Sequence, residues 1–451
     1  MEIEIINTLE CKIGSALAKI LRPILSYTAV YYQQTKYRKI RREYLANVMN
    51  KVGTNYYFYL GLLDKVLSFC KENNIPIKIT GEIETLSLIR TPKLNTKVLR
   101  EEQIRLVTAA TERQRGVLVA PTGTGKSAMG IAIISAFLGE ETKALWLCHT
   151  KDLMYQAARV AKEELGISPG FIGNGITDYS QSITMATRQS FIKVARDIGH
   201  LFDILIYDEA HHCQSKEAQN ILTSVLAPVR IGLTATLPTD IESLLRIEGL
   251  IGPVIEKVTV AEGQERGSMA KVKLKIVKLP MSYSIHDLKA YKDVYRYGVV
   301  EREAQHEACA SIAFSAQNSD RSVLILVSRI EHGENILEVC LKKGVHAVFA
   351  QGKTESDVRA EILRSLSSKE QKVVIATTIF KEGIDVPSLD ILINAAGGKS
   401  EIATLQAIGR GLRTTETKKE VTVVDFFDNS HSFLVNHFGE RLCLYSDLGW
   451  L

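Results

Sequence analysis

The chain has 451 residues, of which 45% are hydrophobic and 24% charged, and it carries a formal net charge of +5 at pH 7. This length is too great for one ordinary hydrophobic core and suits two or three domains, and we expect three. The composition is that of a globular protein and excludes an intrinsically disordered one.

The chain shows no sign of secretion, membrane insertion or cysteine cross-linking. It lacks a run of about 18 apolar residues, and its N-terminus begins acidic and alternating. We therefore expect no membrane partner and a cytoplasmic location, which is the host cytoplasm if the source is viral. The chain is expected to be monomeric or weakly associating. No C-x-x-C pair occurs, so the seven cysteines are predicted to be small core residues: Cys11, Cys70, Cys148, Cys213, Cys309, Cys340 and Cys443.

The positive surplus lies in the first 90 residues, which contain 13 basic and 8 acidic residues, whereas the rest contains 43 of each. Half of the 16 tyrosines lie between Tyr27 and Tyr59, around the run YYQQTKYRKIRREY. Basic and aromatic side chains together suit a nucleic acid. The predicted contacts are Lys36, Arg38, Lys39, Arg41 and Arg42.

Two alternatives to this basic site stay open. The run is also compatible with a solvated helix face or with a surface that docks onto the rest of the chain. Tyr56, Tyr57 and Tyr59 are expected to fill a core rather than to stack on bases.

The first part of the chain predicts a small α+β domain. Residues 3–13 alternate like a strand, and residues 14–22 and 60–73 have helical periodicity. Pro76 and Pro92 bracket the exit from this segment.

From about residue 98 onward, short apolar runs alternate with helical stretches. The runs are GVLVA, ALWLC, SITMAT, DILIYDEA and RIGLTAT, and later SVLILVS, HAVFA, VVIAT, DILINAA and VTVVDF. Continuous apolar strands are typical of parallel sheets covered on both faces. The sequence therefore predicts an α/β protein with three domains at residues 1–92, 93–262 and 263–451.

A phosphate-binding loop is predicted at APTGTGKS, which follows the strand GVLVA and precedes an apolar helical stretch. Glycines let backbone N–H groups converge on phosphates, Lys126 can reach the β- and γ-phosphates, and the Ser127 hydroxyl can hold Mg²⁺. A glycine-rich turn without function is disfavoured by this strand–loop–helix context. The predicted ATP contacts are Pro121, Thr122, Gly123, Thr124, Gly125, Lys126 and Ser127.

A second part of the ATP site is predicted at DEAH, at the end of the apolar strand DILIY. Parallel sheets bind ligands at the edge where their strands end. Asp208 is expected to hold Mg²⁺, and Glu209 to orient and deprotonate the attacking water. An isolated Asp-Glu pair would be read as a solvated turn, and the phosphate loop makes the catalytic interpretation the better one.

With these motifs, residues 98–430 resemble a superfamily 2 helicase, which implies two tandem RecA-like domains behind the N-terminal one. The resemblance implies adenine contacts by Arg100 and Gln103. It implies nucleic-acid contacts by Thr150 in HTKDLMYQ and by Thr187 and Gln189 in ITMATRQSF. His211, Thr234 and Thr236 are the residues implied to couple hydrolysis to domain movement.

The second parallel-sheet domain carries the remaining motifs of this resemblance. VLILVSRIEHGENI contains Ser328 and Arg329, and ATTIFKEGIDVP contains Thr377, which are further nucleic-acid candidates. The resemblance implies nucleotide contacts by Gly383 and Asp385. It implies catalytic roles for Gln406, Arg410 and Arg413 in QAIGRGLR, where the arginines stabilise the transferring phosphoryl group.

The motif set and the basic N-terminal segment look most like phage DNA helicases of the UvsW type, which remodel forks and Holliday junctions and are functionally related to RecG. This implies ATP and Mg²⁺ as cofactors and branched DNA, bound without sequence preference, as the partner. Three alternatives stay open: an RNA helicase or ribonucleoprotein remodeler, a double-stranded DNA translocase of a restriction system, and a non-enzymatic binding module.

Overall fold

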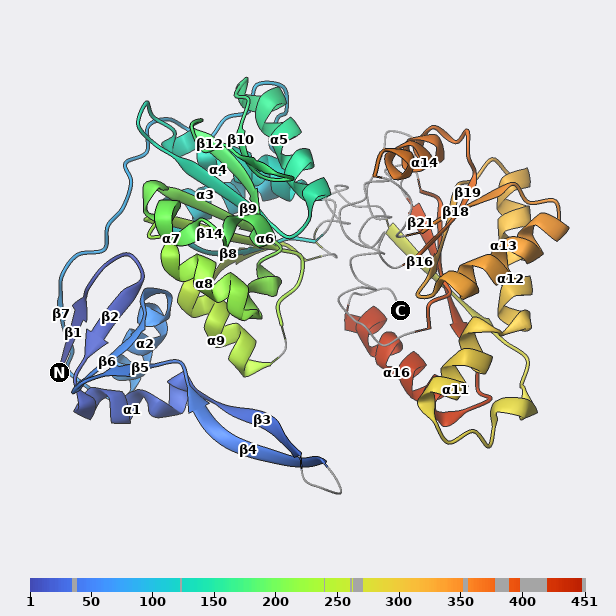
Figure 1. Cartoon of the computed structure of the whole chain (residues 1–451), viewed down its shortest axis with the longest axis horizontal. Coiled ribbons are helices and arrows are strands. Elements are labelled where there is room, and N and C mark those ends of the chain that lie inside the picture. The colour runs from blue at the N-terminus through green and yellow to red at the C-terminus, as the bar shows by residue number, and fades with distance from the viewer. Residues whose placement is uncertain are drawn as a thin grey trace. The chain divides into compact units, whose positions relative to one another are not determined.

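A computed structural model describes residues 1–34, 39–121, 124–238, 240–259, 262, 271–351, 356–377, 389–397 and 420–447 (Figure 1). The chain divides into two compact units, residues 1–120 with 125–258 and residues 121–124 with 259–451. A small N-terminal module and a parallel-sheet domain form the first unit, and another parallel-sheet domain forms the second. The predicted α/β class is confirmed, and the residue-level domain boundaries stay predictions.

The N-terminal module is built on a five-stranded sheet in the order β5-β6-β2-β1-β7. Its strands are β1 (Glu2–Ile5), β2 (Glu10–Ile13), β5 (Asn50–Val52), β6 (Asn55–Tyr59) and β7 (Lys78–Thr80). Its helices are α1 (Ser15–Leu25), the 3₁₀ turn η1 (Leu60–Leu62) and α2 (Leu63–Glu72), as predicted.

The prediction of a single strand over residues 3–13 is wrong, because this segment forms two antiparallel strands, β1 and β2, joined by a turn. The Asn7 side-chain oxygen accepts hydrogen bonds from the backbone N–H groups of Leu9 at 2.8 Å and Glu10 at 2.9 Å. Such local side-chain bonds reverse the chain. Alternation alone does not reveal the turn, since it continues on both sides.

A long antiparallel ribbon, β3 (Ser26–Gln34) and β4 (Lys39–Asn47), extends from the module (Figure 1). Its register runs from the Ser26–Asn47 pair to the Gln34–Lys39 pair. The helix-face alternative is therefore wrong for the part of the basic run in β4, which includes Lys39, Arg41 and Arg42. Lys36 and Arg38 lie outside the described residues.

The module docks closely onto the first parallel-sheet domain. A Cβ on Gly61 of η1 would lie 1.9 Å from the Glu248 carbonyl oxygen, so only glycine permits this backbone approach. Lys65 forms an ion pair with Glu248. Arg246 donates a 2.8 Å hydrogen bond to the Tyr27 hydroxyl at the base of the ribbon. The base of the ribbon is thus fixed to the first parallel-sheet domain by residues outside the basic run.

Two of the three β6 tyrosines, Tyr56 and Tyr59, pack against hydrophobic cores as expected, and the core role of Tyr57 stays a prediction. Tyr59 contacts the position of Gly249, where a Cβ would lie 3.0 Å from its ring. Tyr56 packs against the module's own core. Six of the seven cysteines are buried, and only the core prediction for Cys443 is wrong, because its side chain is exposed.

The first parallel-sheet domain has the strand order β11-β10-β12-β9-β13-β14-β8-β15. The strands are β8 (Arg115–Val119), β9 (Ala144–Cys148), β10 (Gly170–Gly173), β11 (Ile176–Thr177), β12 (Ile183–Thr187), β13 (Ile204–Asp208), β14 (Val229–Thr234) and β15 (Val254–Lys257). The helices are α3 (Glu101–Arg113), α4 (Lys126–Phe137), α5 (Lys151–Leu165), α6 (Arg188–Phe191), α7 (Ala195–Ile198), η2 (Gly199–Leu201), η3 (Ala210–Gln214), α8 (Lys216–Ser224) and α9 (Ile241–Leu250).

Every residue of β9, β12, β13 and β14 is buried, which explains the mostly apolar runs in the sequence.

Ahead of α3, the chain is anchored by the buried carboxylate of Glu164. This carboxylate accepts hydrogen bonds from the Thr96 hydroxyl at 2.7 Å and the Thr96 backbone N–H at 2.9 Å. Burial would raise the pKa of Glu164, but hydrogen bonds from Thr96 and Lys97 outweigh it and lower that pKa to about 2. The anchor is therefore ionised at neutral pH.

The second parallel-sheet domain has the strand order β16-β21-β20-β17-β19-β18. Its strands are β16 (Lys271–Lys278), β17 (Val323–Val327), β18 (Ala347–Ala350), β19 (Val373–Thr377), β20 (Ile391–Asn394) and β21 (Glu420–Phe427), and all neighbours are parallel. Its described helices are η4 (Tyr283–Ile285), α11 (Tyr291–Tyr295), the π-helical turn η5 (Arg296–Val300), α12 (Glu303–Asn318), α13 (Ile330–Lys342), α14 (Ser356–Ser368) and α16 (Ser432–Asp447). Within the described ranges, every helix is too short or too polar to cross a membrane.

Candidate nucleotide and nucleic-acid sites

The predicted motifs of the first domain lie together at one edge of its sheet. Strands β12, β9, β13, β14 and β8 are consecutive, parallel neighbours. Each is followed directly by a motif, so their carboxyl ends bring these motifs side by side. This is the edge at which open α/β sheets bind ligands.

The phosphate-binding loop ends at Gly125, whose φ of +82° places it in the left-handed region immediately before α4. A Cβ here would lie 2.6 Å from the Gln103 side-chain nitrogen, so glycine also makes room for Gln103. The Lys126 amine donates a 3.3 Å hydrogen bond to the Ala120 carbonyl. Ser127 follows in the first turn of α4. Thr122 and Gly123 lie outside the described residues.

Two predicted adenine contacts lie at the start of α3. The Gln103 side-chain oxygen accepts a 2.9 Å hydrogen bond from the Arg100 backbone N–H, which caps the helix. The Arg100 guanidinium forms a 2.8 Å ion pair with Glu102. The structure therefore places Gln103 beside the phosphate loop, and nucleotide binding by either residue stays a prediction.

Asp208 and Glu209 occupy the end of β13 in contrasting environments. Burial and the neighbouring charge of Glu209 raise the pKa of Asp208, while the charge of Lys126 lowers it. Glu209 adopts φ +57° and ψ +55°, a left-handed conformation that costs energy for a residue with a side chain. Its buried Oε2 has no hydrogen-bond donor among the described residues. Such strain and such an unsatisfied oxygen are features of functional sites.

The predicted coupling residues form a continuous hydrogen-bonded chain. The Thr234 hydroxyl donates to the Thr236 carbonyl at 2.6 Å and lies 3.0 Å from His211 Nδ1. Because the hydroxyl has a single proton, Nδ1 of His211 must be the donor to Thr234. Burial, reinforced by the positive charge of Lys126, lowers the pKa of His211 to about 4, so the ring is neutral at pH 7.

These residues fit a magnesium nucleotide. The buried Asp208 carboxylate and the Ser127 hydroxyl are the oxygen ligands that Mg²⁺ prefers. The glycine-lined start of α4 and the Lys126 amine suit phosphate oxygens, since backbone N–H groups and positive charge converge there. The unsatisfied Glu209 Oε2 is an acceptor for a water molecule.

The nucleic-acid candidates of the first domain lie at the ends of β9 and β12. The Thr150 hydroxyl accepts from the Leu153 N–H at 3.3 Å and caps α5, whereas the Thr187 hydroxyl is buried and donates to Ser190 at 3.1 Å. The Gln189 side chain is exposed. Of the three, Gln189 is thus the most available, while both threonines also have local structural roles.

Sequence reasoning missed Arg188, a buried cation between the nucleic-acid and ATP motifs. Its guanidinium donates to the His212 carbonyl at 3.0 Å and lies 2.5 Å from His149 Nδ1. Within the described ranges it forms no ion pair with a carboxylate. The only sequence signal was its position directly after an apolar strand, at the ligand-binding edge of the sheet.

In the second domain, Ser328 and Arg329 follow β17 and are exposed, as nucleic-acid contacts require. The hydroxyl of Thr377, at the end of β19, is buried without a partner among the described residues. Tyr295, which sequence reasoning also missed, contacts both Ser328 and Arg329. Gly383, Asp385, Gln406, Arg410 and Arg413 lie outside the described residues.

Comparisons with known proteins agree with this arrangement. Residues 96–239 match the family described as type III restriction enzyme, res subunit, and residues 304–415 match the helicase conserved C-terminal domain. The DNA 3'-5' translocase XPB2 of Sulfurisphaera tokodaii is 28% identical over 386 residues, which cover 77% of this chain and 86% of the relative. The ATP-dependent DNA helicase uvsW of Enterobacteria phage T4 is 23% identical over 364 residues, covering 74% of this chain and 72% of the relative.

A solved structure of the type ISP restriction-modification enzyme LlaBIII bound to DNA has a TM-score of 0.58 and 15% identity, and the match covers 85% of this chain and 32% of that one. At this identity the likeness supports the fold alone. Two parallel-sheet domains with a phosphate loop and an Asp-Glu pair at a strand end define a helicase-type motor. The chain belongs to helicase superfamily 2.

Proposed function

We propose that this protein is an ATP-dependent DNA helicase or translocase that unwinds and remodels branched DNA, such as forks and Holliday junctions. The observation that carries its ATPase activity is the convergence of Gln103, Lys126, Asp208, Glu209 and the His211–Thr234 pair at one sheet edge. A non-enzymatic binding module would not need the strained backbone at Glu209.

In this proposal each residue of the ATP site has a separate task. Bound Mg²⁺-ATP supplies a phosphoryl group that a water molecule can attack. Lys126 holds phosphate oxygens, and Asp208 with Ser127 holds the metal ion. Glu209 orients the water and accepts its proton through the oxygen that has no other donor. Arg410 and Arg413 stabilise the charge of the transition state, with Gln406 beside them in the same motif.

The nucleic-acid contacts in this proposal are made to the sugar-phosphate backbone. Hydroxyl, amide and guanidinium groups at Thr150, Thr187, Gln189, Ser328, Arg329 and Thr377 can bind phosphates and carry no sequence information. This suits a motor that moves along any sequence. Transmission of the ATP state would run through His211, Thr234 and Thr236, a hydrogen-bonded chain that begins two residues after Glu209 and leads to the end of the neighbouring strand β14.

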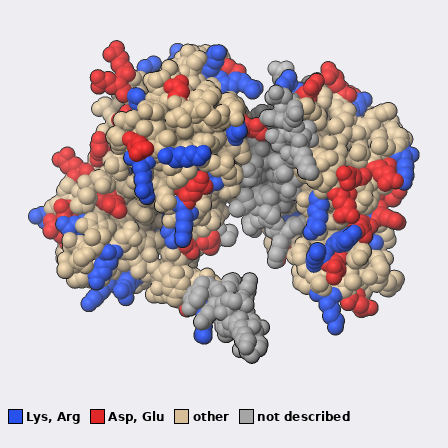
Figure 2. Space-filling model, in the orientation of Figure 1, with Lys and Arg blue, Asp and Glu red and all other residues tan. Residues whose placement is uncertain are grey.

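Preference for branched DNA is assigned to the β3–β4 ribbon. Its register pairs Tyr31 with Arg42 and Tyr32 with Arg41, so two tyrosine positions of β3 lie opposite two arginine positions of β4. Exposed apolar side chains, Val30 and Leu45, lie nearer its base. On the face shown in Figure 2, acidic and basic side chains are interspersed over both parallel-sheet domains. The ribbon therefore offers a concentrated basic and aromatic element for DNA.

Charge reversal on the ribbon is the test of this assignment. Replacing Lys36, Arg38, Lys39, Arg41 and Arg42 by Glu should weaken binding to a fork or junction. Each lost phosphate contact should also reduce the slope of log K against log salt by about 0.9, because fewer counterions are released. ATP turnover at saturating DNA should largely survive. The measurement is fluorescence anisotropy with forked DNA over a salt series.

The matched control reverses five basic residues of the same module that lie outside the ribbon and are exposed: Lys19, Arg22, Lys51, Lys71 and Lys78. It changes the net charge equally and should bind the fork more tightly than the ribbon variant. Equal effects of the two variants would indicate general electrostatics, and an unchanged salt slope in the ribbon variant would exclude a DNA-binding ribbon.

Two other substrates are compatible with the same motor. An RNA helicase would show greater ATPase stimulation by RNA than by forked DNA. A translocase of a restriction system would be stimulated by linear duplex as strongly as by a junction. Comparison of these nucleic acids in one ATPase assay separates the three.

A further inference from the structure

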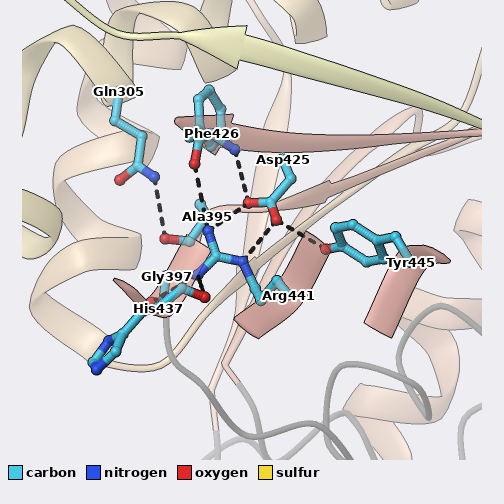
Figure 3. Close-up of polar contacts among 8 residues, drawn as sticks. All are labelled: Gln305, Ala395, Gly397, Asp425, Phe426, His437, Arg441 and Tyr445. Carbon is cyan, nitrogen blue, oxygen red and sulfur yellow. Dashed lines mark hydrogen bonds and ion pairs between the residues drawn. The ribbon is translucent and has the colours of Figure 1, made fainter. Parts of the chain in front are cut away.

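Three consecutive carbonyl groups in the second domain are each held by a side chain from a different helix. Gln305 of α12 donates to the Ala395 carbonyl at 3.3 Å, Tyr295 of α11 to the Ala396 carbonyl at 2.8 Å, and Arg441 of α16 to the Gly397 carbonyl at 3.2 Å. Figure 3 shows Gln305 and Arg441 on this segment. Residues 395–397 follow β20 and lead toward Gln406, Arg410 and Arg413 in the sequence.

The hydrogen bond from Arg441 to the Gly397 carbonyl is part of a buried network. Its guanidinium also binds both carboxylate oxygens of Asp425, at 2.7 and 3.1 Å, and Tyr445 donates to the same carboxylate at 2.9 Å (Figure 3). Paired, planar hydrogen bonds of this kind fix orientation as well as distance. The hydrogen bonds from Arg441 and Gln305 therefore support residues 395–397 in a fixed position.

Tyr295 differs from the other two because it also contacts the candidate nucleic-acid residues. Its hydroxyl is hydrogen-bonded to the Ser328 hydroxyl, and the Arg329 guanidinium lies over its ring at 5.3 Å from the centroid. Ser328 and Arg329 are exposed, whereas Tyr295 is 8% exposed. One buried side chain thus connects an exposed surface to the segment that precedes the arginine motif.

The hydrogen-bond donors of this contact can be assigned by counting protons. Tyr295 has one hydroxyl proton, which it donates to the Ala396 carbonyl. The Ser328 proton must therefore be donated to the Tyr295 oxygen. Burial raises the pKa of Tyr295, so the phenol remains protonated at neutral pH.

A phosphate bound at this surface would compete for both groups that Ser328 and Arg329 offer to Tyr295. A phosphate oxygen is a stronger hydrogen-bond acceptor than a phenol oxygen, so the Ser328 hydroxyl would donate its hydrogen bond to the phosphate instead of to Tyr295. It would also attract the Arg329 guanidinium away from the aromatic ring, since a guanidinium interacts more strongly with a charged phosphate than with an aromatic face. Both events change the contacts of the residue that holds Ala396.

We propose that Tyr295 is a positioning residue that transmits nucleic-acid binding at Ser328 and Arg329 to the segment leading into the arginine motif. This inference rests on the proposed function, because it assumes that a nucleic acid stimulates ATP hydrolysis. Tyr295 itself contacts neither substrate nor nucleotide in this role.

The test compares the stimulation factor, defined as kcat at saturating forked DNA divided by kcat without DNA, in full-length variants. Tyr295→Phe keeps the ring but loses the hydroxyl, and its stimulation factor should fall at least fivefold toward one. Gln305→Met is the matched control, because it removes the hydrogen bond to the neighbouring Ala395 carbonyl and leaves the contacts of Ser328 unchanged. This variant should retain the wild-type stimulation factor. Thermal unfolding of each variant measures the structural cost separately.

A double-mutant cycle completes the test. Ser328→Ala should also lower the factor, and Tyr295→Phe combined with Ser328→Ala should lower it no further, because both changes interrupt one connection. A wild-type factor in Tyr295→Phe, an equal loss in Gln305→Met, or additive losses in the double variant would each overturn the role of Tyr295. Absence of stimulation in the wild-type protein would instead overturn the proposed function, and this role with it.

Discussion

Replacement of Glu209 by Gln should lower ATP turnover by about 10²- to 10⁴-fold, the usual contribution of general acid–base catalysis. Glutamine keeps the size of the side chain and cannot accept the proton of the attacking water. ATP binding should persist, because Gln103, Lys126 and the phosphate loop are unchanged. Turnover is measured by phosphate release, and binding by equilibrium titration with a fluorescent nucleotide.

Lys126→Ala is the comparison for this experiment. It should abolish hydrolysis by weakening the hold on the phosphates, so its ATP affinity should fall where that of Glu209→Gln does not. Wild-type turnover in Glu209→Gln would contradict the role of this carboxylate.

Replacement of Arg410 or Arg413 by Ala should lower kcat by about 10³-fold or more for whichever is the principal arginine, since arginine fingers act on the transition state. ATP affinity should change less. The measurement is steady-state kinetics of DNA-stimulated hydrolysis for each single variant. A rise in KM alone, in both variants, would show that the arginines bind the ground state and would contradict their catalytic role.

The sequence predicted the elements that obey strong local rules. Mostly apolar runs predicted β9, β12, β13 and β14, because strands buried on both faces accept few polar side chains. The phosphate loop and the Asp-Glu pair were recognisable, because their chemistry depends on residues that are adjacent in the chain. The candidate residues of the ATP site in the first domain could therefore be named from the sequence, and their roles stay predictions.

Features that depend on distant contacts could not be predicted. The β3–β4 ribbon has no alternation strong enough to separate strand from helix, so only its register reveals the pairing of tyrosines with arginines. Arg188 follows β12 and donates to the carbonyl of His212, which follows β13, two strands away in the sheet. Tyr295 lies 33 positions before its partner Ser328. Such contacts arise from the order of strands in the sheet, which the linear sequence does not display.

The measurement that most directly tests the proposed function is one unwinding assay on a panel of nucleic acids. The panel contains single-stranded DNA, linear duplex, a fork, a four-way junction and an RNA duplex, with Glu209→Gln as the control for ATP dependence. We expect wild-type protein to convert the fork and the four-way junction in an ATP-dependent manner and faster than the linear duplex. Faster unwinding of the RNA duplex, or equal rates on branched and linear DNA, would contradict a motor specialised for branched DNA.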